Sequence, residues 1–327
     1  MTTSTEIGHI AELHVAIAAV REAALLCGGV HACRAVQKTD RSPVTVADFG
    51  SQALICRRIR AAFPADPIVA EEDSTLLRGR EHASVRDQVV EHVERLQPGS
   101  SADDVLDWVD IGCHEGSSGR FWAVDPLDGT KGFLRGGHYA VAIALVVDGR
   151  AIVAALACPH IAFDSYSPGS IFAATRGGGA SWLSLKRTTP ARRISTSQVD
   201  TPSTARFCES VESMHSSHEL ASAVAHHLGL YKAPVRLDSQ AKYAVVASGQ
   251  ADIYFRLPTR PGYRERIWDH VPGSLITEEA GGRVTDISGK PLELTHGKAL
   301  DANRGVVATN GHLHNAVLDA IAAVVSS

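Results

Sequence analysis

The chain has 327 residues, a length that predicts either one large domain or two packed domains with a substantial hydrophobic core. Hydrophobic residues make up 44% and charged residues 21% of the chain, which is typical of a soluble globular protein and excludes a disordered or fibrous one. The net charge of −4, with both signs interspersed, excludes a basic surface for extended nucleic acid.

Membrane association is not expected. No apolar run approaches the ~20 residues of a spanning helix, and the first residues lack the basic start and apolar block of a signal peptide. The six cysteines contain no C-x-x-C pair, so neither a zinc site nor a disulfide framework is indicated. We therefore expect a cytoplasmic protein with reduced thiols, and we expect it to be a monomer.

The first 130 residues are predicted to alternate between helices and strands. Four elements are predicted: a helix within residues 5–36, a helix from about 48 to 63, and strands at 67–70 and 121–124. The pair Gly28-Gly29 is expected to disturb the first helix, and Pro64 is expected to end the second.

Beyond residue 138, two adjacent apolar runs are separated by Asp148-Gly149-Arg150, which predicts a β-hairpin. A glycine-rich, polar stretch over 159–179 favours a boundary between two domains, 1–159 and 160–327. The second half alternates predicted strands at 172–174, 235–237, 253–255 and 306–308 with predicted helices at 218–229, 240–248, 270–280 and 312–325. This alternation predicts an α+β or α/β fold in which helices cover a sheet.

Carboxylates stand at the ends of three apolar segments: Glu71-Glu72, Asp125 with Asp128, and Asp269. A buried charge must be paired or must bind a cation. Pro126 fixes φ near −65° and starts a turn, which would bring Asp125 and Asp128 to the same side. With the Leu127 carbonyl, these oxygens form the ligand set that Mg²⁺ prefers.

Each segment also has a simpler interpretation. Residues 125–130 match an ordinary Pro-Asp-Gly turn followed by a Thr cap equally well, although Thr130 at a helix N-terminus would also suit water and phosphate binding. Asp269 stands where a helix N-cap belongs, with Pro272 in the first turn and Gly281-Gly282 at the helix end. On local grounds the cap explains Asp269, and only its companions suggest a metal ligand.

Four motifs, in one order along the chain, resemble those of the lithium-sensitive inositol monophosphatase superfamily. They are Pro43-Val44-Thr45-Val46-Ala47-Asp48, Glu71-Glu72, Asp125-Pro126-Leu127-Asp128-Gly129-Thr130 and Trp268-Asp269. Within the superfamily, residues 130–136, 237–243 and 263–270 resemble the 3′(2′),5′-bisphosphate nucleotidases, or PAP phosphatases. Lys131-Gly132-Phe133 is the discriminating segment, since inositol monophosphatases usually carry Thr-Asn-Phe there. The resemblance covers nearly the whole chain.

The resemblance implies a layered αβαβα sandwich with a magnesium centre. In the implied site two or three Mg²⁺ ions are held by Glu71, Asp125, the Leu127 carbonyl, Asp128 and Asp269. Asp48 and Thr130 would orient and deprotonate the attacking water, and Glu72 would orient the site without binding metal. Inhibition by Li⁺ is implied as well.

The resemblance also implies a nucleotide site. Thr130, Ser239 and Lys242 are the implied substrate contacts, the last two on the 5′-phosphate and the nucleoside. Arg256 and His215 are further candidates, and their simpler interpretations are a solvated strand end and a surface histidine.

The implied reaction belongs to sulfur metabolism: 3′-phosphoadenosine 5′-phosphate (PAP) gives AMP and phosphate, with the sulfated analogue PAPS as a second substrate. An inositol polyphosphate 1-phosphatase, alone or as a second activity, is the nearest alternative. A non-catalytic nucleotide sensor is an alternative from another class.

Overall fold

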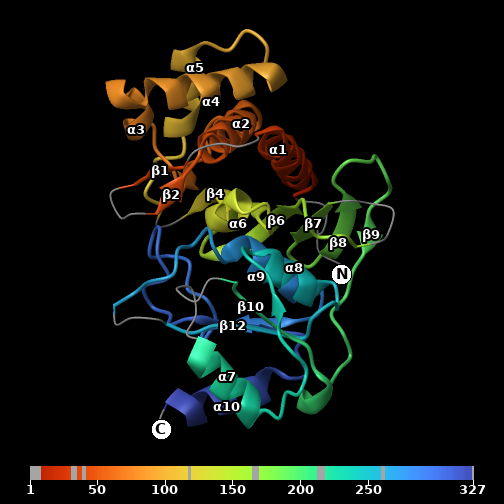
Figure 1. The fold of residues 1–327 in the computed structure, drawn as a ribbon. Coiled ribbons are helices and arrows are strands. Elements are labelled where there is room, and N and C mark those ends of the chain that lie inside the picture. Colours follow the sequence, from red (N-terminus) through yellow and green to blue (C-terminus); the bar gives the residue numbers. More distant parts are fainter. Residues whose placement is uncertain are drawn as a thin grey trace.

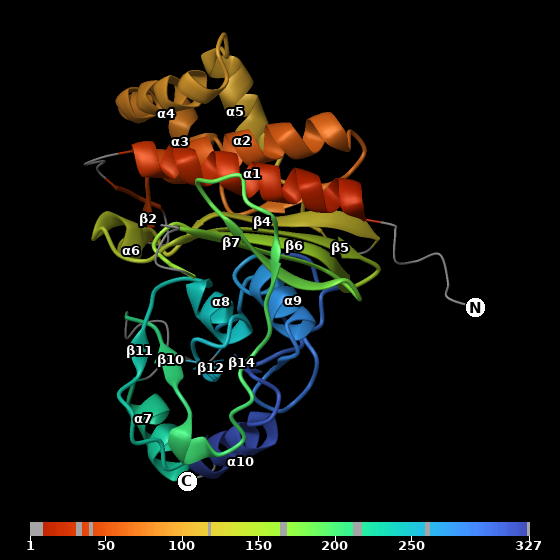
Figure 2. The same ribbon diagram turned by 90° about the vertical axis from the view of Figure 1, so that its right-hand side faces the viewer.

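The computed structural model describes residues 9–30, 35–38, 42–116, 119–163, 169–211, 218–258 and 262–325. Helices and sheets alternate in five layers, which confirms the predicted αβαβα sandwich (Figure 1, Figure 2). The helical layers are α1 (Ile10–Gly29) with α2 (Val46–Ala62), α8 (Ala241–Ala247) with α9 (Val271–Glu279), and α7 (His218–His227) with α10 (His314–Val325). Outside α2, the chain adds α3 (Thr75–Arg78), η1 (Arg80–His82), α4 (Ala83–Leu96) and α5 (Ala102–Asp110).

The first sheet has seven strands that lie in sequence order. They are β3 (Ile68–Ala70), β4 (Arg120–Asp128), β5 (Ala140–Val147), β6 (Arg150–Cys158), β7 (Ser170–Thr175), β8 (Gly179–Ser184) and β9 (Arg192–Arg193). Only the β3–β4 pair is parallel. The predicted hairpin is β5–β6, and its two-residue turn has positive φ at Asp148 (48°) and Gly149 (73°), as a type I′ turn requires.

The second sheet has five strands in the order β11 (Val235–Arg236), β10 (Phe207–Glu209), β12 (Ile253–Arg256), β14 (Val306–Thr309) and β13 (Arg283–Thr285). The small elements are β1 (Val36–Gln37), β2 (Pro43–Val44), α6 (Thr130–Leu134) and η2 (Pro202–Thr204). The boundary expected after residue 159 falls between β6 and β7, which pair in one sheet. The chain passes from the first sheet to the second in the connection between β9 and β10.

Side-chain size explains how the layers fit together. Along β5, Val141, Ile143 and Leu145 point into the core beneath α1 and α2, whereas Ala142 and Ala144 point into the core shared with α8 and α9. Successive strand residues face opposite sides of a sheet, so residues 140–145 put the larger side chains on one face and alanines on the other, and Val146 follows on the alanine side after a register shift. The small face lets α9 pack close to the sheet, with Leu275 and Ile276 in the same core.

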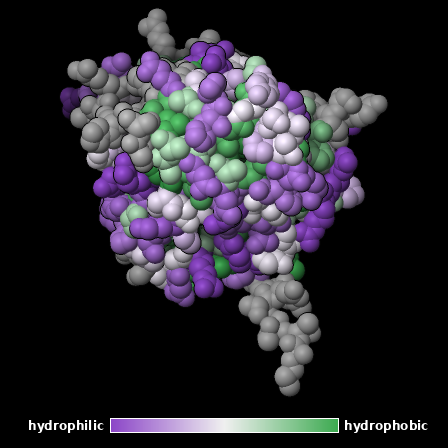
Figure 3. Space-filling view, turned by 90° about the horizontal axis from the view of Figure 1, so that it is seen from below, coloured by the Kyte–Doolittle hydropathy of each residue, from purple (hydrophilic) through white to green (hydrophobic). Residues whose placement is uncertain are grey.

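The helix predictions were close, and several strands were missed. α1 ends at the predicted Gly-Gly pair, α2 begins two residues before Asp48, and α8, α9 and α10 lie within their predicted ranges. The strands β1, β2, β8, β9, β10 and β13 were not predicted, whereas the short strands β3 and β11 were. In the described part of the chain, no helix has the length and hydrophobicity to cross a membrane. From below, hydrophilic residues surround a smaller hydrophobic area (Figure 3).

Candidate metal centre

Two parallel strands bring the first carboxylates together. Ala70, the last residue of β3, pairs with Val124 of β4, so Glu71 and Asp125 follow at the same edge of the sheet. Parallel neighbours end on the same side, which is why strand-end carboxylates from two distant segments meet here. The sequence motifs at these strand ends therefore occupy adjacent positions.

An irregularity in β4 then turns Asp128 toward the same side. Asp125 pairs with Ala142 and Asp128 with Ala140, so three steps along β4 match two along β5. In a regular strand, residues three apart face opposite sides, and one extra residue in a bulge restores the same side. The predicted turn at Pro126 is thus a bulge inside β4, and it has the effect expected of the turn.

The surroundings of Asp125 hold its carboxylate in place. Asp125 is 1% exposed, and its Oδ1 accepts a hydrogen bond from the Leu127 amide at 3.1 Å. The Ser51 hydroxyl donates to the Pro126 carbonyl at 2.6 Å, which fixes the bulge to α2. Burial, and then the charge of Asp128, raises the pKa of Asp125 well above its usual value.

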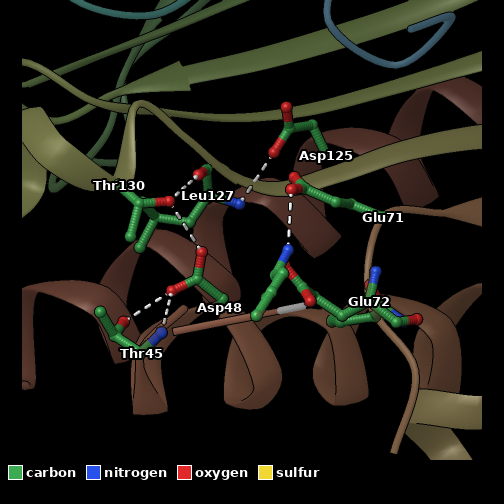
Figure 4. Close-up of polar contacts among 9 residues, drawn as sticks. Thr45, Asp48, Glu71, Glu72, Asp125, Leu127 and Thr130 are labelled. Atoms are coloured by element: carbon green, nitrogen blue, oxygen red, sulfur yellow. Dashed lines mark hydrogen bonds and ion pairs between the residues drawn. The ribbon is translucent and has the colours of Figure 1, made fainter. Parts of the chain in front are cut away.

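Asp48 and Thr130 form a hydrogen-bonded pair beside these carboxylates (Figure 4). Asp48 is the third residue of α2, and its Oδ2 accepts from the amide and the hydroxyl of Thr45 at 2.8 and 2.6 Å in a capping box. Its Oδ1 accepts from the Thr130 hydroxyl at 3.1 Å. Burial, opposed by the hydrogen bonds from Thr45, raises the pKa of Asp48 to about 6. Gly129 occupies the cap position of α6, so Thr130 is not a cap.

Glu71 and Glu72 share a cation that the sequence analysis did not anticipate. The Lys38 ammonium donates to Glu71 Oε1 at 3.0 Å and to Glu72 Oε1. Burial alone would lower the pKa of Lys38, but the two carboxylates raise it. Gln52 Oε1 accepts a hydrogen bond from the Glu72 amide, and Gln52 Nε2 donates one to the Glu72 carbonyl. The segment after β3 is thereby fixed to α2.

Asp269 approaches the site from the other half of the chain. Its carboxylate lies 3.6 Å from Nη1 of Arg256, and the cap position of α9 belongs to His270, whose side chain makes no capping bond. Arg256 also contacts Glu265 at 3.1 Å and the Tyr263 hydroxyl at 2.8 Å. The cap interpretation of Asp269 and the solvated-strand interpretation of Arg256 are therefore both wrong.

A polar chain continues behind Arg256. Glu265 Oε2 lies 3.0 Å from Nε2 of His270, whose Nδ1 lies 2.8 Å from the Tyr243 hydroxyl. The ligand atoms of Glu265, Asp269 and His270 lie within 4.8 Å of one another. The Arg256 guanidinium contacts two of these three side chains, so a cation of the protein already balances this cluster.

The segment before α8 contacts Asp128. The Gln240 amide donates to Asp128 Oδ2 at 2.6 Å. Lys242 is 4% exposed, and its ammonium donates to the carbonyls of Ser239 and Leu237 at 2.7 and 3.2 Å. The Ser239 hydroxyl accepts from the Ala241 amide, and its φ of 67° is unusual for a residue other than glycine.

The site concentrates negative charge. Burial is the main reason that the pKa values of Asp125, Asp128 and Asp269 are raised, and neighbouring carboxylates raise those of Asp125 and Asp269 further. Protonation or a neighbouring cation would stabilise each of these carboxyl groups. An arrangement of this kind suits a divalent ion with oxygen ligands.

The structure brings together nearly all of the predicted site residues. They are Asp48, Glu71, Glu72, Asp125, Leu127, Asp128, Thr130, Ser239, Lys242, Arg256 and Asp269. His215 lies outside the described residues. Lys38, Gln240, Glu265 and His270 were missed. Lys38 stands in a short polar loop with no local pattern, whereas Glu265 and His270 stand within a segment already singled out by resemblance.

Comparisons with known proteins agree with this geometry. The model of the inositol monophosphatase family matches residues 9–326. A 3′(2′),5′-bisphosphate nucleotidase of Schizosaccharomyces pombe is 41% identical over 97% of this chain and 96% of its own. A 3′(2′),5′-bisphosphate nucleotidase of Emericella nidulans is 42% identical over 95% of this chain and 97% of its own.

Among solved structures, an inositol monophosphatase of Thermotoga maritima superposes with a TM-score of 0.65 at 21% identity, over 96% of this chain and 98% of its own. An inositol monophosphatase from Anabaena superposes with a TM-score of 0.60 at 24% identity, over 95% of each chain. These structures bear on the fold alone. The family model and the nucleotidase relatives confirm the resemblance predicted from the motifs.

Proposed function

The chain belongs to the inositol monophosphatase family, and on that premise we propose that it is a Mg²⁺-dependent phosphomonoesterase acting on 3′-phosphoadenosine 5′-phosphate. It releases the 3′-phosphate and leaves AMP, and it also accepts PAPS. The observation that carries this proposal is the Asp48–Thr130 hydrogen bond beside a buried carboxylate cluster. The nucleotidase relatives support the choice of substrate.

The donor set fits Mg²⁺. Glu71, Asp125, Asp128 and Asp269 offer carboxylate oxygens, and the Leu127 carbonyl offers a fifth oxygen; we propose these as the ligands of two or three ions. The pKa values of Asp125, Asp128 and Asp269 are raised mainly by desolvation, so a bound cation would favour their charged forms. When bound, Mg²⁺ supplies charge that polarises the phosphate and stabilises the leaving oxygen. Li⁺ would inhibit by taking one of these positions.

Asp48 would accept a proton of the attacking water through the Thr130 hydroxyl. The Thr130 hydroxyl donates to Asp48 Oδ1, so the lone pairs of its oxygen are left to accept a hydrogen bond from a water. As the water oxygen bonds to phosphorus, one water proton would pass to the Thr130 oxygen and the Thr130 proton to Asp48. The bond between phosphorus and the 3′ oxygen breaks, and that oxygen takes a proton from solvent water. Thr45 keeps Oδ2 occupied, so Oδ1 is the oxygen that receives the proton. Glu72 would only orient this site.

The second phosphate and the nucleoside require positive charge away from the reacting phosphate. Lys242 has three N–H donors, and two of them reach carbonyls within the described residues, so one is left for the 5′-phosphate. We propose Ser239 and Arg256 as further contacts of the nucleotide, with His215 as a candidate. Arg256 lies beside Asp269, which brings this cation next to the metal centre.

The test is a substrate panel with one preparation of the protein. We expect hydrolysis of PAP in the presence of Mg²⁺, none with EDTA, and inhibition by Li⁺. PAPS should be hydrolysed as well, and inositol 1,4-bisphosphate more slowly. Rapid hydrolysis of the inositol substrate with negligible hydrolysis of PAP would favour the polyphosphate 1-phosphatase alternative. No hydrolysis of any substrate, with tight binding of PAP, would favour a sensor.

Two aspartate variants separate the metal centre from general effects of charge. Asp128→Asn should abolish turnover while the fold is kept, because it removes a charged ligand beside the Gln240 amide. Asp87→Asn makes the same chemical change at an exposed residue of α4 that pairs only with its neighbour Arg86 among the described residues, and it should keep full activity. Retained activity in Asp128→Asn would refute the metal assignment.

A further inference from the structure

An ion pair connects α6, beside the metal centre, to the segment that precedes α8. The Arg135 guanidinium, just after α6, donates from Nη2 to Asp238 Oδ2 at 2.8 Å. The Asp238 side chain is 8% exposed, whereas that of Arg135 is 43% exposed. Arg135 belongs to the connection between β4 and β5, and Asp238 follows β11 of the second sheet, so this pair joins the two halves of the chain (Figure 1, Figure 2).

Two glycines make this close approach possible. A Cβ atom on Gly132 would lie 2.2 Å from the His138 carbonyl oxygen and 2.7 Å from Asp238 Oδ2. A Cβ on Gly129 would lie 3.1 Å from the Cβ of Ser239, and Gly129 has a φ of 90° that other residues rarely adopt. A side chain at position 132 would therefore displace the His138 carbonyl, the Asp238 side chain or both.

The segment held in this way carries the proposed contacts of the second phosphate. Asp238 is followed by Ser239 in a left-handed conformation, by Gln240, whose amide contacts Asp128, and by Lys242, whose ammonium is fixed by the Ser239 and Leu237 carbonyls. Because Lys242 is bonded to the backbone on both sides of Asp238, a displacement of Asp238 displaces the ammonium as well.

We infer that Gly132, Arg135 and Asp238 form a clamp that positions the 239–242 segment for the second phosphate of a bisphosphorylated substrate. They are positioning residues, since none of them belongs to the proposed metal ligands or phosphate contacts. The inference rests on the proposed function. Its consequence is that loss of the clamp weakens hydrolysis of a bisphosphate more than that of a monophosphate, on which it acts only through the contact of Gln240 with Asp128.

The experiment compares two substrates that differ only in the second phosphate, PAP and 3′-AMP, with the full chain and Mg²⁺. Arg135→Gln and Asp238→Asn should raise KM for PAP about three- to tenfold, the range expected for the loss of one ordinary hydrogen bond, with a smaller change in kcat. KM and kcat for 3′-AMP should change less than KM for PAP, because a monophosphate depends on this segment only through the contact of Gln240 with Asp128. Arg135→Lys should recover most of the wild-type KM for PAP, because it keeps the charge.

The matched control is Arg176→Gln. The Arg176 side chain has a similar exposure, 41%, and pairs with Glu278 at 2.7 Å. Both residues are more than 30 positions from the 237–242 segment in the sequence. It should leave both substrates unchanged. Gly132→Ala tests the close approach independently of charge, and it should act like Asp238→Asn, with the thermal unfolding midpoint recorded for each variant.

Three results would overturn the clamp. If Arg135→Gln behaves like Arg176→Gln toward PAP, the ion pair has no positioning role, and the proposed function stands. If the variants lose activity equally on PAP and 3′-AMP, their role is only structural. If the wild-type protein hydrolyses 3′-AMP and not PAP, the proposed function fails and the specificity role fails with it.

Discussion

The hydroxyl group of Thr130 is the residue-scale feature on which the proposed chemistry depends. It donates to Asp48 Oδ1 at 3.1 Å, and its distance to the Leu127 carbonyl is 3.4 Å. We expect Thr130→Ala to lower kcat on the order of 10²- to 10⁴-fold, the usual contribution of a positioned proton-transfer group. Thr130→Ser keeps the hydroxyl and should keep activity within about tenfold. Steady-state kinetics with PAP at saturating Mg²⁺ measures both. An alanine variant as active as the serine variant would contradict the proton relay.

A second residue-scale prediction concerns stability rather than chemistry. Arg256 is largely buried between Glu265 and Asp269, so Arg256→Gln removes a cation that contacts both carboxylates. Its free energy of unfolding should fall by about 3–5 kcal/mol, the usual effect of breaking a buried ion pair from one side. Adding Glu265→Gln should recover part of this loss, because the double variant no longer buries that charge. Urea unfolding of the wild type, the two single variants and the double variant, with EDTA present, measures these differences.

The control for these variants is Arg95→Gln. Arg95 pairs with Glu91 one helical turn away, and both side chains are more than half exposed. Such a pair contributes about 0.3–0.5 kcal/mol. If Arg256→Gln lost no more stability than Arg95→Gln, the charge balance described for the buried cluster would be wrong.

At the scale of elements, His314 fastens α10 to the second sheet. Its ring is fully buried, with Nε2 2.9 Å from the Thr285 hydroxyl of β13 and Nδ1 3.1 Å from the Thr309 hydroxyl of β14. The Thr285 hydroxyl donates to the Asp286 carbonyl, so it accepts from His314, which assigns the proton to Nε2. Burial, and then the charge of Arg283, lowers the pKa of His314 to about 4.

The sign of the resulting pH dependence follows from this lowered pKa. Between about pH 6.5 and pH 4 the unfolded chain binds the proton more readily than the folded one, so stability is present above pH 6.5 and is lost as the pH falls toward 4. His314→Gln keeps a donor and an acceptor but does not titrate. The difference between wild-type and variant urea midpoints should therefore shrink as the pH falls from 7 to 5. A constant difference would contradict the assignment of a neutral, buried ring.

The elements also mark how far the sequence predicts the structure. The β5–β6 hairpin and the long helices followed from local patterns, since a type I′ turn and helical spacing are encoded within a few residues. β10 and β13 have three residues each, and they form strands by pairing with distant segments. No local sequence pattern therefore predicts them. The bulge at Pro126 was predicted as a turn because proline and glycine favour both, and only pairing with β5 distinguishes them. Lys38 reaches Glu71 through the fold, across 33 positions of sequence.

At the scale of the whole molecule, the site combines strand ends of the first sheet with segments that belong to the second half of the chain. Asp48, Glu71 and Asp125 come from one side, and Asp269 comes from the other. Electrostatic repulsion among them opposes folding, and the contacts of Lys38 with Glu71 and of Arg256 with Asp269 offset part of it. Bound ions that recognise only the folded state stabilise it, by about 2.7 kcal/mol at a concentration 100 times Kd. The metal centre should therefore set the stability of the whole chain.

Removal of metal tests this coupling. In EDTA, Asp125→Asn should raise the unfolding midpoint above that of the wild type, because it removes a buried charge and keeps an acceptor for the Leu127 amide. In excess Mg²⁺ the order should reverse, since the variant has lost a proposed ligand. The control is Asp66→Asn, whose carboxylate pairs with Arg120 at 2.8 Å and accepts from the Trp122 indole; it should be destabilising in both conditions. If Asp125→Asn were destabilising in EDTA as well, Asp125 would be a structural residue, and the repulsion inferred from its raised pKa would be absent.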